Sequence, residues 1–228
     1  MTQLSFDFGE QHNRNTAVRD LMPQKLQLMC EFLRNAHVQL SQVSPDGRIN
    51  SAVSEQNVLL ALIKRFPDID IPDGKSRKWY DFSFRDEDGN FYPVNIKISK
   101  MSSTPDNVSS KTGVFYAITG IVPPKEYGWE NFWDELHSNE HNPSNGSDYY
   151  FIIINKNDTS DVFCTSLKHL NEVRTNGNNF PFQCCWDKNR TLVDRTDEEA
   201  REFLLNTLKE SVEKDTMARN YYRVYGNR

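Results

Sequence analysis

Long hydrophobic stretches are missing from this sequence, and hydrophobic residues make up only 37% of the chain. No apolar run approaches the roughly 20 residues that a membrane-spanning helix needs, so we expect no membrane partner. The first fifteen residues, MTQLSFDFGEQHNRN, lack the basic start and the apolar stretch of a secretory signal peptide. The four cysteines show no CxxC spacing, which argues against a disulfide framework. These absences predict a soluble, cytoplasmic protein with reduced thiols.

An excess of basic residues is also missing, because 27 Lys and Arg face 32 Asp and Glu, for a net charge of -5. Phosphate binding normally relies on such an excess, so a nucleic-acid partner requires a local basic surface. The cluster KSRK at 75–78, followed by Lys97, Lys100 and Lys111, offers one. The phosphate-binding patterns GxxxxGKS and GxxxxGKT are absent, which counts against an ATPase.

The chain length and the hydrophobic periodicity indicate the fold class. With 228 residues the chain can bury one large core, and we expect a mobile N-terminal arm over 1–15 and a single domain over 16–228. Helical spacing of apolar residues predicts three helices, at 18–40, 54–66 and 197–218. SPDGRIN, before the second of these helices, is typical of a turn. Strands are predicted at 79–85, 91–99, 149–155, 161–164 and 181–186. The expected fold is α/β, with a mixed central sheet flanked by helices, in which YYFIIIN is a central strand buried on both faces.

The two aromatic-rich strands around the turn DEDGN carry the most specific pattern. A two-residue turn at Asp88-Gly89 would pair residues whose numbers sum to about 177, and Asp81 would then lie opposite residue 96. Side chains alternate between the faces of a strand. On the second strand we therefore expect Val94, Ile96 and Ile98 to face the core. On the first strand we expect Tyr80, Phe82 and Phe84 to share one face. The other face holds Asp81, Asn95, Lys97 and Ser99.

A carboxylate, an amide and a lysine thus converge on one polar patch. Such a patch suits phosphodiester hydrolysis, in which a hard cation needs oxygen ligands and the phosphate needs positive charge near the attacking water. The same spacing also occurs by chance, and a charged hairpin face is often only solvated. The context favours chemistry, since a helix with Glu55 precedes the hairpin and the basic cluster stands immediately before Asp81.

At these residues the sequence resembles a known family. Asp81 followed by Asn95-Ile96-Lys97 resembles the PD-(D/E)xK signature of type II restriction endonucleases, in the MspI-like variant that has Asn in place of the second acid. The overall layout resembles that of the EcoRV-like enzymes of this family. The resemblance lies in residues 44–66, 75–82 and 174–180 and in the closing NYYRVYGNR. The resemblance implies a restriction-endonuclease-like fold and Mg²⁺-dependent cleavage of double-stranded DNA. It also implies a homodimer that reads a short, palindromic site.

The resemblance further implies roles for single residues. Asp81, Asn95, Glu55 and the backbone carbonyl of Ile96 would hold Mg²⁺, while Lys97 would hold the scissile phosphate or orient the attacking water. Asn95 replaces an acid, so the site has one negative charge fewer than the usual pattern. For Glu55 the alternative is a helix-start carboxylate that the helix dipole favours.

DNA contacts would fall to loops, each of which is otherwise an ordinary surface loop. Asn can contact adenine through two hydrogen bonds in the major groove, and Gly permits a close approach. The predicted base-reading loop contains Asn176, Gly177, Asn178 and Asn179. The predicted minor-groove or phosphate loop contains Lys75, Ser76, Arg77 and Lys78. Further predicted DNA contacts are Ser99, Lys100 and Asn107.

Two other functions stay open at this point. A repair or recombination nuclease that nicks DNA would use the same hairpin chemistry. Because Asn95 is not an acid, a catalytically inactive DNA-binding protein of the same fold is the second alternative.

Overall fold

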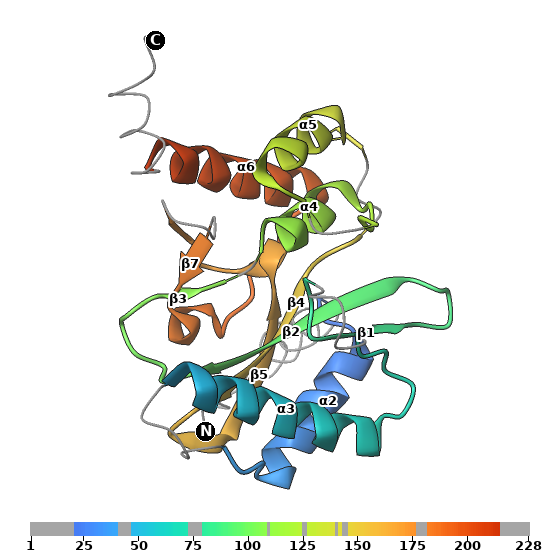
Figure 1. Cartoon of the computed structure of the whole chain (residues 1–228), viewed down its shortest axis with the longest axis vertical. Coiled ribbons are helices and arrows are strands. Elements are labelled where there is room, and N and C mark those ends of the chain that lie inside the picture. Colours follow the sequence, from blue (N-terminus) through green and yellow to red (C-terminus); the bar gives the residue numbers. More distant parts are fainter. Residues whose placement is uncertain are drawn as a thin grey trace, which may run out of the picture.

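The computed structural model describes residues 21–40, 47–72, 79–108, 110–124, 127–139, 141–142, 146–176 and 182–214 (Figure 1). The predicted N-terminal arm lies outside these residues. So do the basic loop at 75–78 and most of the predicted base-reading loop, from 177 onward.

A mixed sheet lies at the centre of the fold, with the strand order β1-β2-β4-β5. Its strands are β1 (Phe82–Arg85), β2 (Phe91–Ser99), β4 (Tyr150–Asn155) and β5 (Asp158–Ser166). Strand β2 pairs antiparallel with β1 and parallel with β4, and β4 pairs antiparallel with β5. The first five residues of β4 are buried, as expected for a central strand covered on both faces. The predicted mixed α/β fold is confirmed.

Two helices cover one face of this sheet: α2 (Gln24–Ala36) and α3 (Gly47–Arg65). Their buried side chains, including Leu26 and Leu62, join Val94 and Ile96 in one hydrophobic cluster. Helix α2 is shorter than the predicted 18–40. The predicted turn over 44–50 was wrong in its second half, because α3 already begins at Gly47. The predicted helix began at Ser54, so residues 47–53 of α3 were missed.

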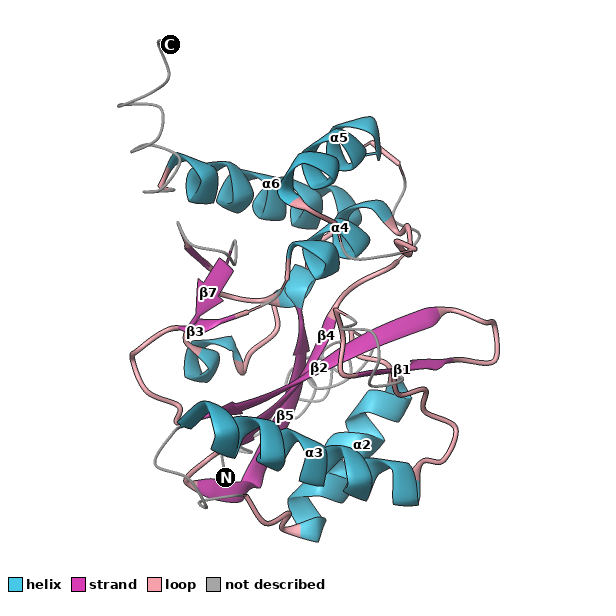
Figure 2. Cartoon of the chain, in the orientation of Figure 1, coloured by secondary structure: helices cyan, strands magenta, loops and turns pink. Residues whose placement is uncertain are grey.

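On the other side lie α4 (Lys111–Thr119), α5 (Trp129–Asn139) and α6 (Asp197–Glu213), together with a small antiparallel sheet (Figure 2). The small sheet has the order β3-β7-β6, from β3 (Asp106–Asn107), β7 (Phe182–Cys184) and β6 (Arg174–Thr175). Two short 3₁₀ helices, η1 (Leu167–His169) and η2 (Trp186–Asn189), complete this part. Helix α6 begins with a reciprocal cap, in which Glu199 accepts the backbone N–H of Thr196 at 2.9 Å and Thr196 accepts that of Glu199 at 3.2 Å.

Helix α4 is buried on every side from Thr112 to Thr119, as an all-round apolar helix in a core should be. The Ser110 hydroxyl caps its start by accepting the backbone N–H of Gly113 at 3.3 Å. A Cβ at Gly113 would come within 2.9 Å of the Tyr149 ring, so the helix reaches the sheet only because this residue has no side chain. No helix in the described part of the chain is long and apolar enough to cross a membrane.

Candidate active site

The hairpin of β1 and β2 forms as predicted, with a one-residue difference in register. Phe82 pairs with Val94 and Arg85 with Phe91, so paired numbers sum to 176 and not to about 177. The turn closes with the backbone N–H of Gly89 donating to the Asp86 carbonyl at 3.1 Å, and Gly89 has φ +82°. Residues 87–89 thus form a three-residue loop with glycine in the left-handed region, in place of the predicted two-residue turn.

The two faces of β2 separate its side chains as the alternation predicted. Val94 and Ile96 are buried in the cluster with α2 and α3, and Ile98 packs against it, while Asn95 and Lys97 belong to the opposite face and are half-buried. The grouping of Tyr80 with Phe82 and Phe84 was wrong. Tyr80 precedes β1 and packs on the opposite side of the sheet, where the centroid of its ring lies 5.0 Å from the centroid of the Trp79 ring.

Asp81 is held against β2 by hydrogen bonds at both its backbone and its side chain. Its N–H donates to the Val94 carbonyl at 2.9 Å, and its Oδ2 accepts the backbone N–H of Ile96 at 2.6 Å. Trp79, two residues before Asp81, is fixed in turn, because its carbonyl accepts the buried Tyr149 hydroxyl at 2.5 Å. These bonds bracket Asn95 and place the Asp81 carboxylate beside it.

Glu55 and Lys97 act electrostatically on each other and on Asp81. Burial, followed by repulsion from the Asp81 carboxylate, raises the pKa of Glu55 to about 7, although Lys97 opposes the shift. Burial also raises the pKa of Asp81, against the hydrogen bond from Ile96 and the charge of Lys97. Burial lowers the pKa of Lys97, against the attraction of Asp81 and Glu55. The helix α3 thus delivers its carboxylate to the same site as the hairpin.

Among the residues that the structure describes, no hydrogen bond or ion pair reaches the side chain of Glu55, Asn95 or Lys97. A half-buried ammonium and carboxylate without partners cost free energy. The Glu55 carboxylate and the Asn95 amide beside Asp81 are therefore available to a cation, and the Lys97 ammonium is available to an anion.

The sequence reasoning missed Asp106, the first residue of β3. The charge of Asp106 opposes the lowering of the Lys97 pKa by burial, so a third carboxylate acts on this lysine. The buried Ser99 hydroxyl donates to Asp106 Oδ2 at 2.7 Å. No local sequence pattern predicts the contact between Ser99 and Asp106, because it depends on the pairing of β3 with β7. The predicted phosphate contact of Ser99 stays a prediction.

The small sheet gathers amide side chains close to this site. The Asn107 side-chain oxygen accepts Asn176 Nδ2 at 3.2 Å and Gln183 Nε2 at 3.1 Å. Of the predicted DNA contacts, Asn107 and Lys100 are exposed, whereas Asn176 is buried. The structure thus brings Asn107 and Asn176 together, and the base-reading loop begins at this cluster. The other predicted contacts, Lys75, Ser76, Arg77, Lys78, Gly177, Asn178 and Asn179, lie outside the described residues.

The oxygen donors of the site fit a hard cation, although the set is short of acids. Within the described ranges, no group of three or more His, Cys, Asp or Glu residues could hold a metal ion. The predicted ligands are the carboxylates of Glu55 and Asp81, the Asn95 amide oxygen and the Ile96 carbonyl. Oxygen atoms of these kinds are what Mg²⁺ prefers, and a cation would relieve the repulsion that raises the pKa of Glu55.

No family model matches this chain, and no curated protein matches it.

Proposed function

We propose that this chain is a Mg²⁺-dependent endonuclease of the type II restriction class. It would hydrolyse phosphodiester bonds at a short, palindromic site in double-stranded DNA. The observation that carries the proposal is the gathering of Glu55, Asp81 and Lys97 in one half-buried site where their charges interact without a direct ion pair. A bound cation together with a DNA phosphate would satisfy both signs of charge.

Asp81 and Glu55 would hold the cation through carboxylate oxygens, with Asn95 and the Ile96 carbonyl as neutral ligands. Mg²⁺ held there would supply Lewis-acid activation of the phosphate. The Asp81 carboxylate is suited to this task because, among the described residues, hydrogen bonding engages its Oδ2, through the backbone N–H of Ile96, and leaves Oδ1 available. The substitution of an acid by Asn95 leaves the metal site with two carboxylates.

Lys97 would act on the phosphate itself. Its ammonium donates hydrogen bonds to a non-bridging phosphate oxygen and stabilises the negative charge that grows on it as water attacks. The water oxygen forms a bond to phosphorus and gives up a proton to solvent, while the bond from phosphorus to a sugar oxygen breaks and that oxygen takes up a proton from solvent. The charges of Glu55, Asp81 and Asp106 oppose the lowering of the Lys97 pKa that burial causes.

The partners follow from the substrate. A palindromic site has twofold symmetry, so we propose a homodimer in which each subunit cuts one strand. The loops at 75–78 and 176–179, with Ser99, Lys100 and Asn107, would contact the DNA. Chromosomal and invading DNA meet such an enzyme in the cytoplasm, where we place it. The restriction-endonuclease-like arrangement of the α/β fold belongs to the same proposal.

Digestion of a sequenced, supercoiled plasmid with Mg²⁺ tests the proposal. We expect discrete fragments from the unaltered protein and none after chelation of the metal. Lys97→Ala and Asp81→Ala should each cut on the order of 100-fold more slowly or worse, with the fold and much of the DNA binding retained. Lys209→Ala, which changes an exposed lysine of α6, is the matched control and should cut normally.

Each other result has a definite meaning. Nicked circles without linear fragments support a repair or recombination nuclease, and binding without any cutting supports an inactive DNA-binding protein. Near-normal cutting by purified Lys97→Ala or Asp81→Ala would rule out the hairpin as the active site.

A further inference from the structure

Two cysteines that are far apart in the sequence meet between α2 and β5. Cys30 lies on α2 and is fully buried, and Cys164 lies on β5 and is half-buried. Cys30 belongs to the hydrophobic cluster against which Cys164 packs, and the interaction between the two thiols is the first cause of the pKa shift of each. Both thiols are free. They lie on the α2 and α3 side of the sheet, whereas Asn95 and Lys97 face the other side. This thiol pair is therefore separate from the candidate active site.

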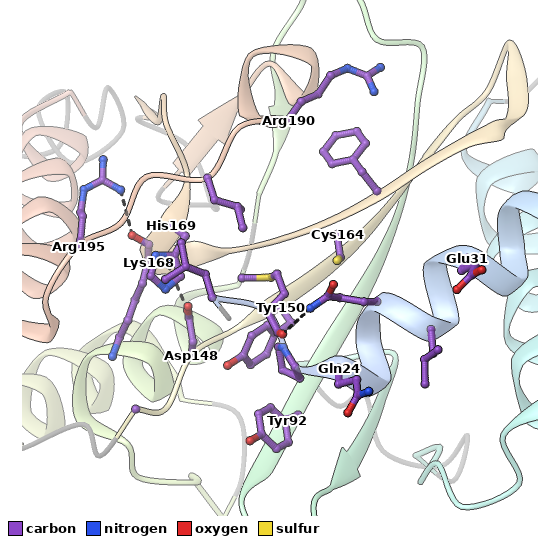
Figure 3. A pocket seen from close by; sticks show the side chains of 18 of the residues that line it. Gln24, Glu31, Tyr92, Asp148, Tyr150, Cys164, Lys168, His169, Arg190 and Arg195 are labelled. Atoms are coloured by element: carbon purple, nitrogen blue, oxygen red, sulfur yellow. Dashed lines mark hydrogen bonds between the residues drawn. The ribbon is translucent and has the colours of Figure 1, made fainter. Parts of the chain in front are cut away.

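A cavity of about 1380 Å³ gives access to one of the two thiols. Helix α2, strand β5 and the segment 190–197 contribute to its walls, and Cys164 is one of the lining residues (Figure 3). Cys30 does not line the cavity and is covered by the hydrophobic cluster. A small reagent that enters from solvent therefore meets Cys164 first, and Cys30 lies behind it.

The surroundings of the pair favour the thiolate on Cys164. The interaction with the Cys30 thiol, and then the positive charge of Arg34, lower the pKa of the Cys164 thiol, although burial opposes them. Arg34 is held there, because its Nε donates to the Val162 carbonyl of β5 at 2.7 Å. The same interaction, together with burial, raises the pKa of the Cys30 thiol. Because the thiolate is the nucleophilic form of cysteine, the two thiols have unequal roles.

We propose that Cys164 is a peroxide-reactive thiol and that Cys30 resolves its oxidised form as an intramolecular disulfide. In the first step the Cys164 sulfur attacks hydrogen peroxide, an S–O bond forms, the O–O bond breaks, and the released hydroxide is protonated to water. The sulfur is oxidised by two electrons to a sulfenic acid. In the second step the Cys30 sulfur attacks that of Cys164, an S–S bond forms, the S–O bond breaks, and water leaves with the Cys30 proton.

The two other cysteines serve as internal controls. Burial raises the pKa of the Cys184 thiol, which disfavours its thiolate. The buried Cys185 thiol donates a hydrogen bond to the Ser103 carbonyl at 3.2 Å. Neither residue lines the cavity that reaches Cys164. In a reducing cytoplasm a Cys30–Cys164 bond would be transient, as cytosolic disulfides in general are.

The experiment treats the reduced, folded full-length chain with hydrogen peroxide, blocks remaining thiols with N-ethylmaleimide, and maps non-reduced peptides by mass spectrometry. We expect the Cys30 and Cys164 peptides joined with the loss of two hydrogen atoms, while Cys184 and Cys185 are still alkylated. The cross-link should raise Tm by on the order of 5–15 °C, and dithiothreitol should reverse the shift. A sulfenic acid on Cys164 beside an alkylated Cys30, or faster oxidation of Cys184 or Cys185, would overturn the proposal.

Variants separate the two steps. Cys30→Ala should stop at a Cys164 sulfenic acid that dimedone traps, and Cys164→Ser should leave Cys30 reduced under the same treatment. Cys185→Ser should still form the cross-link. Oxidation of Cys30 in the Cys164→Ser variant would refute the order of the two steps. Peptide mapping of the unaltered chain decides the main point even where a variant folds poorly.

Discussion

Replacing Lys168 by methionine should destabilise the protein through the charges that this lysine balances. Lys168 is 4% exposed and its Nζ lies 2.6 Å from Asp197 Oδ1. Asp148, also 4% exposed, has its pKa raised by burial, and the charges of Lys168 and His169 oppose that shift. The variant would therefore leave a buried carboxylate with His169 as its remaining positive neighbour.

The expected loss follows from how deeply each partner is buried. Removing one partner of a fully buried ion pair costs about 3–5 kcal/mol. The Asp197 side chain is 40% exposed and can be hydrated, so we expect the low end, about 3 kcal/mol. For a chain of this size that lowers Tm by about 6–12 °C.

The loss should also grow with pH. The folded-state pKa of Asp148 is already above its unfolded value, and removing the positive charge raises it further. A raised carboxyl pKa gives stability that is fully present below the unfolded pKa and is lost as pH rises through the folded one. Lys168→Met should therefore be closer to the unaltered protein at pH 5 than at pH 8.

Denaturant unfolding at both pH values measures the effect, with Lys188→Met as the matched control. Lys188 also pairs with a carboxylate, Glu172, at 2.8 Å, but the two side chains are 53% and 29% exposed. Exposed pairs contribute about 0–1 kcal/mol, so this control should lose little. Equal losses in the two variants, or a larger loss for Lys168→Met at pH 5 than at pH 8, would refute the reasoning.

Two further substitutions test the site and its support. Asn95→Asp adds a negative charge where a cation is proposed. It should lower the Mg²⁺ concentration needed for half-maximal cleavage by about tenfold. An unchanged Mg²⁺ titration would mean that Asn95 is not a ligand. Gly113→Ala places a methyl group 2.9 Å from the Tyr149 ring, and overpacking of this kind costs about 1–3 kcal/mol. Thermal melts should show this loss but little change for Gly128→Ala, whose methyl group meets nothing within 4 Å; equal melts would contradict the tight fit.

The hairpin was predictable because its information is local. Alternation of apolar and polar residues along 91–99 assigned Val94 and Lys97 to opposite faces, and the structure agrees. The register was harder, since the same turn sequence allows a two-residue or a three-residue loop. Two features select the three-residue loop. Gly89 follows the central residues of the turn and adopts a positive φ, and the Asp86 carboxylate accepts the Asn90 backbone N–H at 2.8 Å.

Elements without a local signature were not predicted. Helix α4 is apolar on all sides, so it shows no amphipathic period. Strands β3 and β6 have two residues each, too few for any alternation. Asp106 was missed for this reason, because it faces Lys97 only through the pairing of β3 with β7. The contact of Cys30 with Cys164 likewise depends on packing between α2 and β5.

The strict alternation along β2 limits which length changes this chain can tolerate over evolutionary time. A deletion of one residue between Phe91 and Lys97 would turn the lysine toward the hydrophobic cluster and bring an isoleucine into the polar site. An insertion among residues 87–89 lengthens only an exposed loop and leaves the phase of the strand intact. Among natural variants of this sequence we therefore expect insertions and deletions at the hairpin tip, and a fixed spacing from Asp81 to Phe84 and from Phe91 to Ser99.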